Sequence, residues 1–350
     1  MTPPVAGVRA GFGSGGSDGR VAAMSATSLR SPRAWSAPGA GSAVVASAVA
    51  VLTAILLAFL MLPVSAARAG DAGADPADSL GSPAAADQTS TSPQARGVGR
   101  VSDWGHVLQV VDWLRYRPPP SRVVYLFGGS AARESVVSER SWASQLGTVS
   151  GSPVVTYVVA KRCQTFVEDK LVVDQLPEGR GVALISVGAT RITMEHDPAP
   201  VHSSATRSVP PGPWYQHHYD TFPALSAAEK RGLVTAWLRN RYGQFVSRYP
   251  EKLVEIDELI QACLDRGLRP VLLEMPLNLP VVGHAFDEVR AMYAAGCLEL
   301  ATKYDIEYIR FVSKIGLRGT DFYDLQHLLP SGRSKWQTRL SQELVSRELL

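Results

Sequence analysis

The stretch Val123-Val124-Tyr125-Leu126-Phe127, which runs directly into Gly128-Gly129-Ser130, decides how the folded part of this 350-residue chain is built. A run of β-branched, aromatic and aliphatic residues without a polar interruption is typical of a strand buried on both faces, as in a parallel sheet. The glycines permit a tight turn, after which Ser130 opens a helical segment. A serine placed there lies at the carboxyl edge of the sheet, where ligands bind in open α/β folds.

The same apolar pattern recurs along the chain and alternates with segments of helical periodicity. Further strands are predicted at 154–159, 182–187, 271–275 and 306–311. Helices are predicted from Trp104 to Leu114 and at 131–146, 165–175, 227–247, 251–266, 286–304 and 331–349. Apolar strands separated by helices indicate a parallel sheet covered on both faces by right-handed crossovers. We therefore predict one α/β domain over residues 101–350, a three-layer doubly wound sandwich with a five-stranded parallel sheet.

The first hundred residues have a different composition. Residues 1–42 are rich in Gly, Ser, Ala and Pro and carry four arginines and one aspartate, which predicts a disordered basic segment. Residues 43–64 are uncharged and long enough to cross a bilayer as a helix. Residues 65–100 return to small and polar residues, and we expect a disordered linker.

The segment 43–64 has two interpretations, a transmembrane anchor or the hydrophobic region of a signal peptide. Arginines before it place the N-terminus in the cytoplasm. Val64-Ser65-Ala66 and Ala67-Arg68-Ala69 both resemble signal-peptide cleavage sites. Both interpretations place the folded domain outside the cytoplasm, either as part of a single-pass protein of the cell membrane or as a secreted protein.

The charge balance argues against nucleic acid as a partner. The chain has 35 basic and 32 acidic residues, and the excess of three comes from residues 1–42. The rest of the chain is neutral and gives no support for nucleic-acid binding, which needs a basic face.

Three cysteines are present, Cys163, Cys263 and Cys297. An exported protein permits one disulfide, and Cys263 with Cys297 is the first pair to test because the two fall in helices on either side of one strand. The alternative is three buried free thiols. The spacing does not predict a zinc site.

A long segment between Arg191 and Pro223 contains six prolines together with Trp214, Tyr215 and several histidines. Long loops in compact domains are often lids or binding loops, and these side chains suit stacking against a sugar. A variable surface excursion is the alternative. His217-His218 has no carboxylate or cysteine at ligand spacing, so we predict no metal site and no organic cofactor.

Near the end of the chain, Asp324-Leu325-Gln326-His327 places a carboxylate three residues before an imidazole. A serine needs a neighbouring base to become a nucleophile, and His327 can act as that base while Asp324 orients its ring. Asp321 is the reserve candidate for the acid. Ser130, His327 and Asp324 are therefore the candidate catalytic residues.

These two blocks resemble those of the SGNH (GDSL-like) hydrolase superfamily, over a span from about Arg122 to the C-terminus. The segment 123–135 (VVYLFGGSAARES) is similar to the first block of that family, and 324–327 to its last. The resemblance implies a flavodoxin-like sandwich that cleaves or transfers acyl esters. Exported, membrane-anchored relatives often modify polysaccharides of the cell envelope.

Three positions depart from the pattern of that family. Gly129 stands where the name-giving motif has aspartate. Residues 160–164 (AKRCQ) contain no glycine for the oxyanion hole. Gly188-Ala189-Thr190 resembles the Gly-x-Asn block with threonine in place of asparagine. We expect Gly129, Gly188 and Thr190 to line the oxyanion and substrate site.

The segment 274–278 (EMPLN) adds two candidates, because it follows a predicted strand. Asn278 is placed with the substrate-binding residues, and Glu274 is interpreted as a satisfied residue at the edge of the sheet. The sequence thus predicts an extracytoplasmic serine esterase or O-acyltransferase that acts on acyl esters of envelope carbohydrate. The alternative is a catalytically silent SGNH-like domain that binds envelope glycan or a partner protein.

Overall fold

The computed structural model describes residues 102–117, 122–201 and 217–350 of the chain. The segments expected at 1–42, 43–64 and 65–100 lie outside the described residues. Within the described ranges, none of the helices combines the length and the apolar character needed to cross a membrane.

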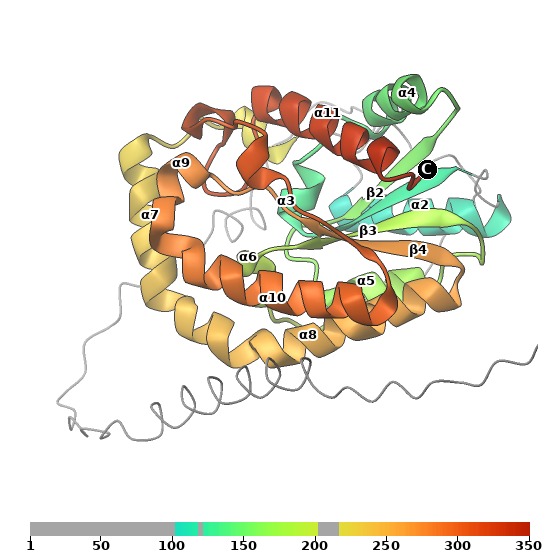
Figure 1. The fold of residues 1–350 in the computed structure, drawn as a ribbon, viewed down its shortest axis with the longest axis horizontal. Coiled ribbons are helices and arrows are strands. Elements are labelled where there is room, and N and C mark those ends of the chain that lie inside the picture. The colour runs from blue at the N-terminus through green and yellow to red at the C-terminus, as the bar shows by residue number, and fades with distance from the viewer. Residues whose placement is uncertain (1–101, 118–121, 202–216) are drawn as a thin grey trace, which may run out of the picture. The chain divides into compact units, whose positions relative to one another are not determined.

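A five-stranded sheet forms the centre of the domain (Figure 1). Its strands are β1 Val123–Gly128, β2 Val155–Ala160, β3 Gly181–Val187, β4 Leu268–Glu274 and β5 Glu307–Ile309. They are all parallel and lie in the order β2-β1-β3-β4-β5. This is the strand order of flavodoxin-like folds, with the topological switch point between β1 and β3.

Side chains alternate between the two faces of the sheet, and each face has its own apolar core. On one face, Tyr125 and Phe127 pack against four helices, and on the other, Val124 and Leu126 pack against three. The first set is α2 Asp103–Tyr116, α5 Phe166–Val173, α8 Tyr242–Asp265 and α10 Asp287–Tyr304. The second set is α3 Ser130–Arg133, α4 Glu139–Ser150 and α11 Pro330–Ser346. These three layers confirm the predicted doubly wound sandwich.

A third apolar cluster stands beyond the carboxyl ends of the strands. Trp237, Phe245, Phe286 and Tyr293 are buried in it and join short helices to the main body. The elements of this cluster include α6 Ala189–Ile192, α7 Ala227–Asn240, α9 Leu279–Val282 and the 3-10 turn Gly283–Phe286. Further 3-10 turns lie at His218–Thr221, Val312–Lys314 and Gly319–Asp321. This cluster supports the loops that carry the site described below.

Two predicted helix boundaries are wrong. The expected helix 131–146 is divided into α3 and α4, since Ser138 caps a new helix by accepting a hydrogen bond from the Ser141 amide. The expected break at 248–250 is instead at Arg241, and Pro250 lies inside α8.

The cysteines are all free, and the Cys263–Cys297 pair is not bonded. Cys263 and Cys297 are buried in the core beneath the sheet, as the free-thiol interpretation predicts. Cys163 is exposed, so for this residue the expectation of burial was wrong. Its backbone adopts the left-handed conformation, with φ of 59°, at the end of the turn that follows β2.

Candidate active site

Ser130 lies at the first position of α3, directly after the turn that ends β1. Gly128 makes that turn possible, since a Cβ atom at this position would lie 2.0 Å from the Ser186 hydroxyl on β3. The first N–H groups of a helix have no partner within it, so the Ser130 amide is available to a ligand. The sequence thus presents a hydroxyl and a backbone donor together at the switch point of the sheet.

His327 approaches Ser130 from a segment 197 residues further along the chain. Its Nε2 atom lies 2.8 Å from the Ser130 hydroxyl oxygen, which is hydrogen-bond distance. Its Nδ1 atom lies 2.7 Å from Asp324 Oδ2 on the other side of the ring. Ser130 and His327 are both buried. The three side chains form a continuous hydrogen-bonded chain from carboxylate to hydroxyl, which is the arrangement of a serine nucleophile with its base and orienting acid.

Asp324 is held in its ionised form by the turn in which it lies. Its Oδ1 atom accepts hydrogen bonds from the amides of Gln326 and His327, both at 2.9 Å. Burial raises the pKa of this carboxyl, but the charge and hydrogen bond of His327 and the two amide bonds outweigh it, so that the pKa lies below its ordinary value. Asp321, the reserve candidate, is instead bonded to Ser331, Lys335 and the Arg318 amide.

Asn278 holds the loop of the triad and does not line the pocket. Its side-chain amide donates to the Asp324 carbonyl at 2.9 Å, and its own main-chain amide donates to the Leu325 carbonyl. The side chain is fully buried and lies outside the pocket lining, where the sequence had predicted it. Glu274 is likewise buried and is bonded to Arg290 and Tyr293, as its interpretation as a satisfied residue predicts.

A buried carboxylate joins the segments around the triad. Glu134, at the end of α3, accepts a hydrogen bond from the His218 amide and lies 2.9 Å from His217 Nδ1. Arg333 approaches the same carboxylate at 3.4 Å and donates to the Leu328 carbonyl beside His327. Glu134 thereby connects the nucleophile helix to the 217–218 segment and to the turn of the general base.

Tyr219 covers one face of the candidate base. Its ring stacks on the His327 imidazole with centroids 4.1 Å apart and planes 22° from parallel. The abundance of aromatic residues between 191 and 223 was the only signal of this contact in the sequence. A ring packed on the imidazole restricts its rotation and keeps Nε2 directed at Ser130.

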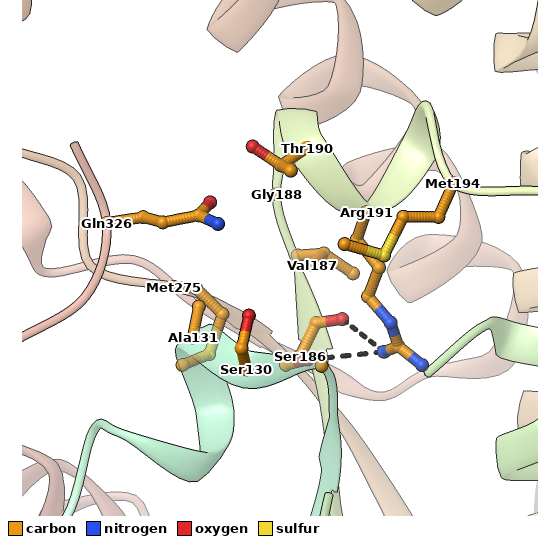
Figure 2. Close-up of a pocket in the computed structure, with 11 residues that line it drawn as sticks. Ser130, Ala131, Ser186, Val187, Gly188, Thr190, Arg191, Met194, Met275 and Gln326 are labelled. Atoms are coloured by element: carbon orange, nitrogen blue, oxygen red, sulfur yellow. Dashed lines mark hydrogen bonds between the residues drawn. The ribbon is translucent and has the colours of Figure 1, made fainter. Parts of the chain in front are cut away.

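A pocket opens at the nucleophile and encloses about 330 Å³, including the part open to solvent. Figure 2 shows the Ser130 hydroxyl directed into this space, with Gln326 on one side and Thr190 on the other. Its lining comes from the turns after β1, β3 and β4 and from the triad loop. The lining residues are Gly129, Ser130, Ala131, Ser186, Val187, Gly188, Thr190, Arg191, Met194, Met275 and Gln326.

Three predicted residues of the oxyanion and substrate site, Gly129, Gly188 and Thr190, therefore lie in the pocket lining. Gly188 precedes α6, and its extended backbone brings the Thr190 side chain to the same cavity as Ser130. Within the lining, Arg191 pairs with the buried Asp169 and donates to the Ser186 carbonyl at 2.7 Å. These bonds fix the turn after β3, and with it the position of Thr190.

The structure brings the serine after β1 and the Asp-x-x-His turn before α11 together at one edge of a sheet with the order β2-β1-β3-β4-β5. The domain has a doubly wound, flavodoxin-like α/β fold. No family model matches the sequence, and no curated protein matches it at a significant level.

Solved structures of other proteins are similar to this chain at low identity. One is a GDSL-like lipase from Bacteroides thetaiotaomicron, with 10% identity, 71% of this chain and 100% of the other covered, and a TM-score of 0.38. Another is an acetylxylan esterase from Geobacillus stearothermophilus, with 9% identity, 64% and 94% covered, and a TM-score of 0.42.

Proposed function

We propose that this chain is an extracytoplasmic serine esterase or O-acyltransferase that acts on acyl esters of cell-envelope carbohydrate. The observation that carries the proposal is the 2.8 Å distance between Ser130 Oγ and His327 Nε2, with Asp324 on the far side of the ring. The silent-domain alternative expects these atoms to lie beyond hydrogen-bond reach. The distance supports the enzyme.

In the proposed reaction, Ser130 Oγ attacks the ester carbonyl carbon while its proton passes to His327 Nε2. The carbonyl oxygen becomes an oxyanion, which the Ser130 amide stabilises together with the Gly188 amide or the Thr190 hydroxyl. Collapse of this intermediate breaks the bond to the alcohol, which takes the proton back from Nε2 and leaves an acyl-serine. Water or a second alcohol then attacks the acyl-serine by the same steps, which gives hydrolysis or transfer.

The small pocket favours a short acyl group. Its walls at Val187, Met194 and Met275 are apolar, which suits a methyl or short alkyl chain. No metal or organic cofactor enters this reaction. The proposed location outside the cytoplasm depends on residues 43–64 and is tested by cell fractionation with protease accessibility.

The direct test is labelling of the full chain with a fluorophosphonate probe, which reacts with activated serines. We expect one labelled site, Ser130, and loss of labelling in Ser130→Ala. Ser186→Ala is the matched control, because Ser186 also lines the pocket but its hydroxyl is bonded to Arg191. Labelling that persists in Ser130→Ala would refute the assignment of the nucleophile.

A further inference from the structure

Four aromatic side chains gather beside the candidate base. Tyr219 stacks on His327, and Tyr323 lies on Tyr219 with centroids 4.8 Å apart. The ring centroid of Phe222 lies 6.4 Å from that of Tyr323 and 5.2 Å from that of His218. The His218 ring also meets the Tyr219 ring edge-on, with centroids 5.0 Å apart. We refer to His218, Tyr219, Phe222 and Tyr323 as the aromatic cluster.

The cluster is open to solvent although its rings are large and mostly apolar. Phe222 is 43% exposed, and the other three members are only half-buried. Exposed apolar surface of this kind often marks a place where a ligand or partner binds.

The backbone that carries the cluster is fixed on both sides. The Tyr323 amide donates to the His327 carbonyl at 2.8 Å, and the Leu225 amide donates to the Tyr323 carbonyl at 3.2 Å. At the other end, the buried Glu134 accepts from the His218 amide at 3.0 Å. The rings are therefore presented in a set arrangement, and little freedom of the chain is lost when a ligand binds.

The chemistry at Ser130 determines which part of an ester meets the cluster. The departing alcohol must take its proton from His327 Nε2, so its oxygen lies within hydrogen-bond distance of that atom. The pocket beside Ser130 accommodates the acyl group and contains none of the cluster residues. The alcohol part therefore extends past the imidazole, and Tyr219 is stacked on that imidazole.

We propose that the aromatic cluster is a binding subsite for the sugar ring of the alcohol part of the substrate, with Phe222 and Tyr323 as its specificity-determining residues. This inference rests on the proposed ester chemistry and adds the residues that recognise the alcohol. A pyranose presents C–H bonds on its ring faces, which pack on the π face of an aromatic side chain.

Polar groups suited to the hydroxyls of a sugar lie in the cluster and in the lining of the Ser130 pocket. The Gln326 side chain reaches the mouth of the pocket and offers a donor and an acceptor. Burial and the charge of Arg162 hold the pKa of His218 below its ordinary value, against the opposing charge of Glu134. At neutral pH the His218 ring is therefore uncharged and likewise offers one donor and one acceptor.

The test compares two acetyl esters with the full chain, an acetylated methyl pyranoside and glycerol triacetate, which has no ring. We expect kcat/KM for the pyranoside ester, relative to that for glycerol triacetate, to fall about three- to tenfold in Phe222→Ala, mainly through KM. Leu298→Ala is the matched control, because Leu298 is an apolar side chain 60% exposed on α10. Its ratio should equal that of the wild type.

An unchanged ratio in Phe222→Ala, or an equal fall in Leu298→Ala, would overturn the subsite. If the wild type turns over neither ester, with water or with an added alcohol as acceptor, the proposed function fails. Calorimetric binding of the pyranoside ester to Ser130→Ala then tests the subsite separately: binding that weakens when Phe222→Ala is added supports it, and binding that does not depend on Phe222 refutes it.

Discussion

Glu134 and His217 form a buried pair, with His217 Nδ1 lying 2.9 Å from Glu134 Oε2. Glu134 is fully buried and His217 is 9% exposed. The second ring nitrogen of His217 lies 3.0 Å from the Val137 carbonyl, so both ends of the ring are held. The pair fixes the start of the segment 217–219, in which the Tyr219 ring stacks on His327. The orientation of the His327 ring therefore depends on this pair.

The first prediction concerns activity in Glu134→Gln. The substitution keeps the shape of the side chain but weakens its hold on His217 and Arg333, and we expect kcat to fall about tenfold because Nε2 is less well directed at Ser130. Steady-state kinetics on an acetyl ester measure it. Glu168→Gln is the matched control, since Glu168 is an equally buried glutamate with its own cation partner, Lys161. An equal loss of kcat in both variants would contradict a role specific to Glu134.

The second prediction concerns stability against pH in the same variant. Burial raises the pKa of Glu134, but the bond to His217 and the charge of Arg133 outweigh it and hold the pKa below its ordinary value. The ionised carboxylate therefore stabilises the fold above the unfolded-state pKa, about 4.3, and this contribution is lost as pH falls through the lower folded-state pKa. We expect Glu134→Gln to lower the free energy of unfolding by about 2 kcal/mol at pH 7.

The difference between wild type and Glu134→Gln should shrink as the pH is lowered below 4, measured by urea unfolding at each pH. Glu299→Gln, at an exposed position, provides the comparison and should differ little from the wild type. A difference for Glu134→Gln that is constant from pH 7 to pH 3 would show that its ionisation is not linked to folding.

The third prediction separates the two glycines before the nucleophile. A Cβ atom at Gly128 meets the Ser186 hydroxyl at 2.0 Å, whereas at Gly129 the nearest atom is the Gln164 carbonyl oxygen at 3.9 Å. We expect Gly128→Ala to lower the free energy of unfolding by about 2–3 kcal/mol through overpacking, and Gly129→Ala to leave it nearly unchanged. Thermal unfolding compares the two, and equal melting temperatures would be inconsistent with this packing.

The fourth prediction tests the threonine that replaces asparagine in the turn after β3. Thr190→Val removes the hydroxyl and keeps the shape, and we expect kcat to fall about 10²-fold if the hydroxyl stabilises the oxyanion. Thr190→Asn supplies a longer donor, and its kcat should equal or exceed that of the wild type. An unchanged kcat in Thr190→Val would leave the Gly188 amide as the partner of the Ser130 amide.

The strands and the turn at Ser130 could be predicted from sequence because each depends on a short local pattern. The apolar run before Gly128 indicates both a buried strand and its end, and Asp324 lies within one turn of His327. The contacts of Glu134 with His217 and of Tyr219 with His327 join residues far apart in the chain, and no local pattern encodes such pairs. Pro250 misled the prediction because packing within α8 outweighs its local preference.

The last prediction concerns Asn278, whose buried amide donates to the Asp324 carbonyl. Asn278→Leu keeps a similar volume and removes this bond, so the turn that carries Asp324 and His327 is less firmly placed. We expect kcat to fall about tenfold with KM little changed, because Asn278 does not line the pocket. Asn240→Leu, at an exposed position at the end of α7, is the matched control and should keep full activity. A rise in KM with unchanged kcat would instead place Asn278 in contact with substrate, as the sequence had suggested.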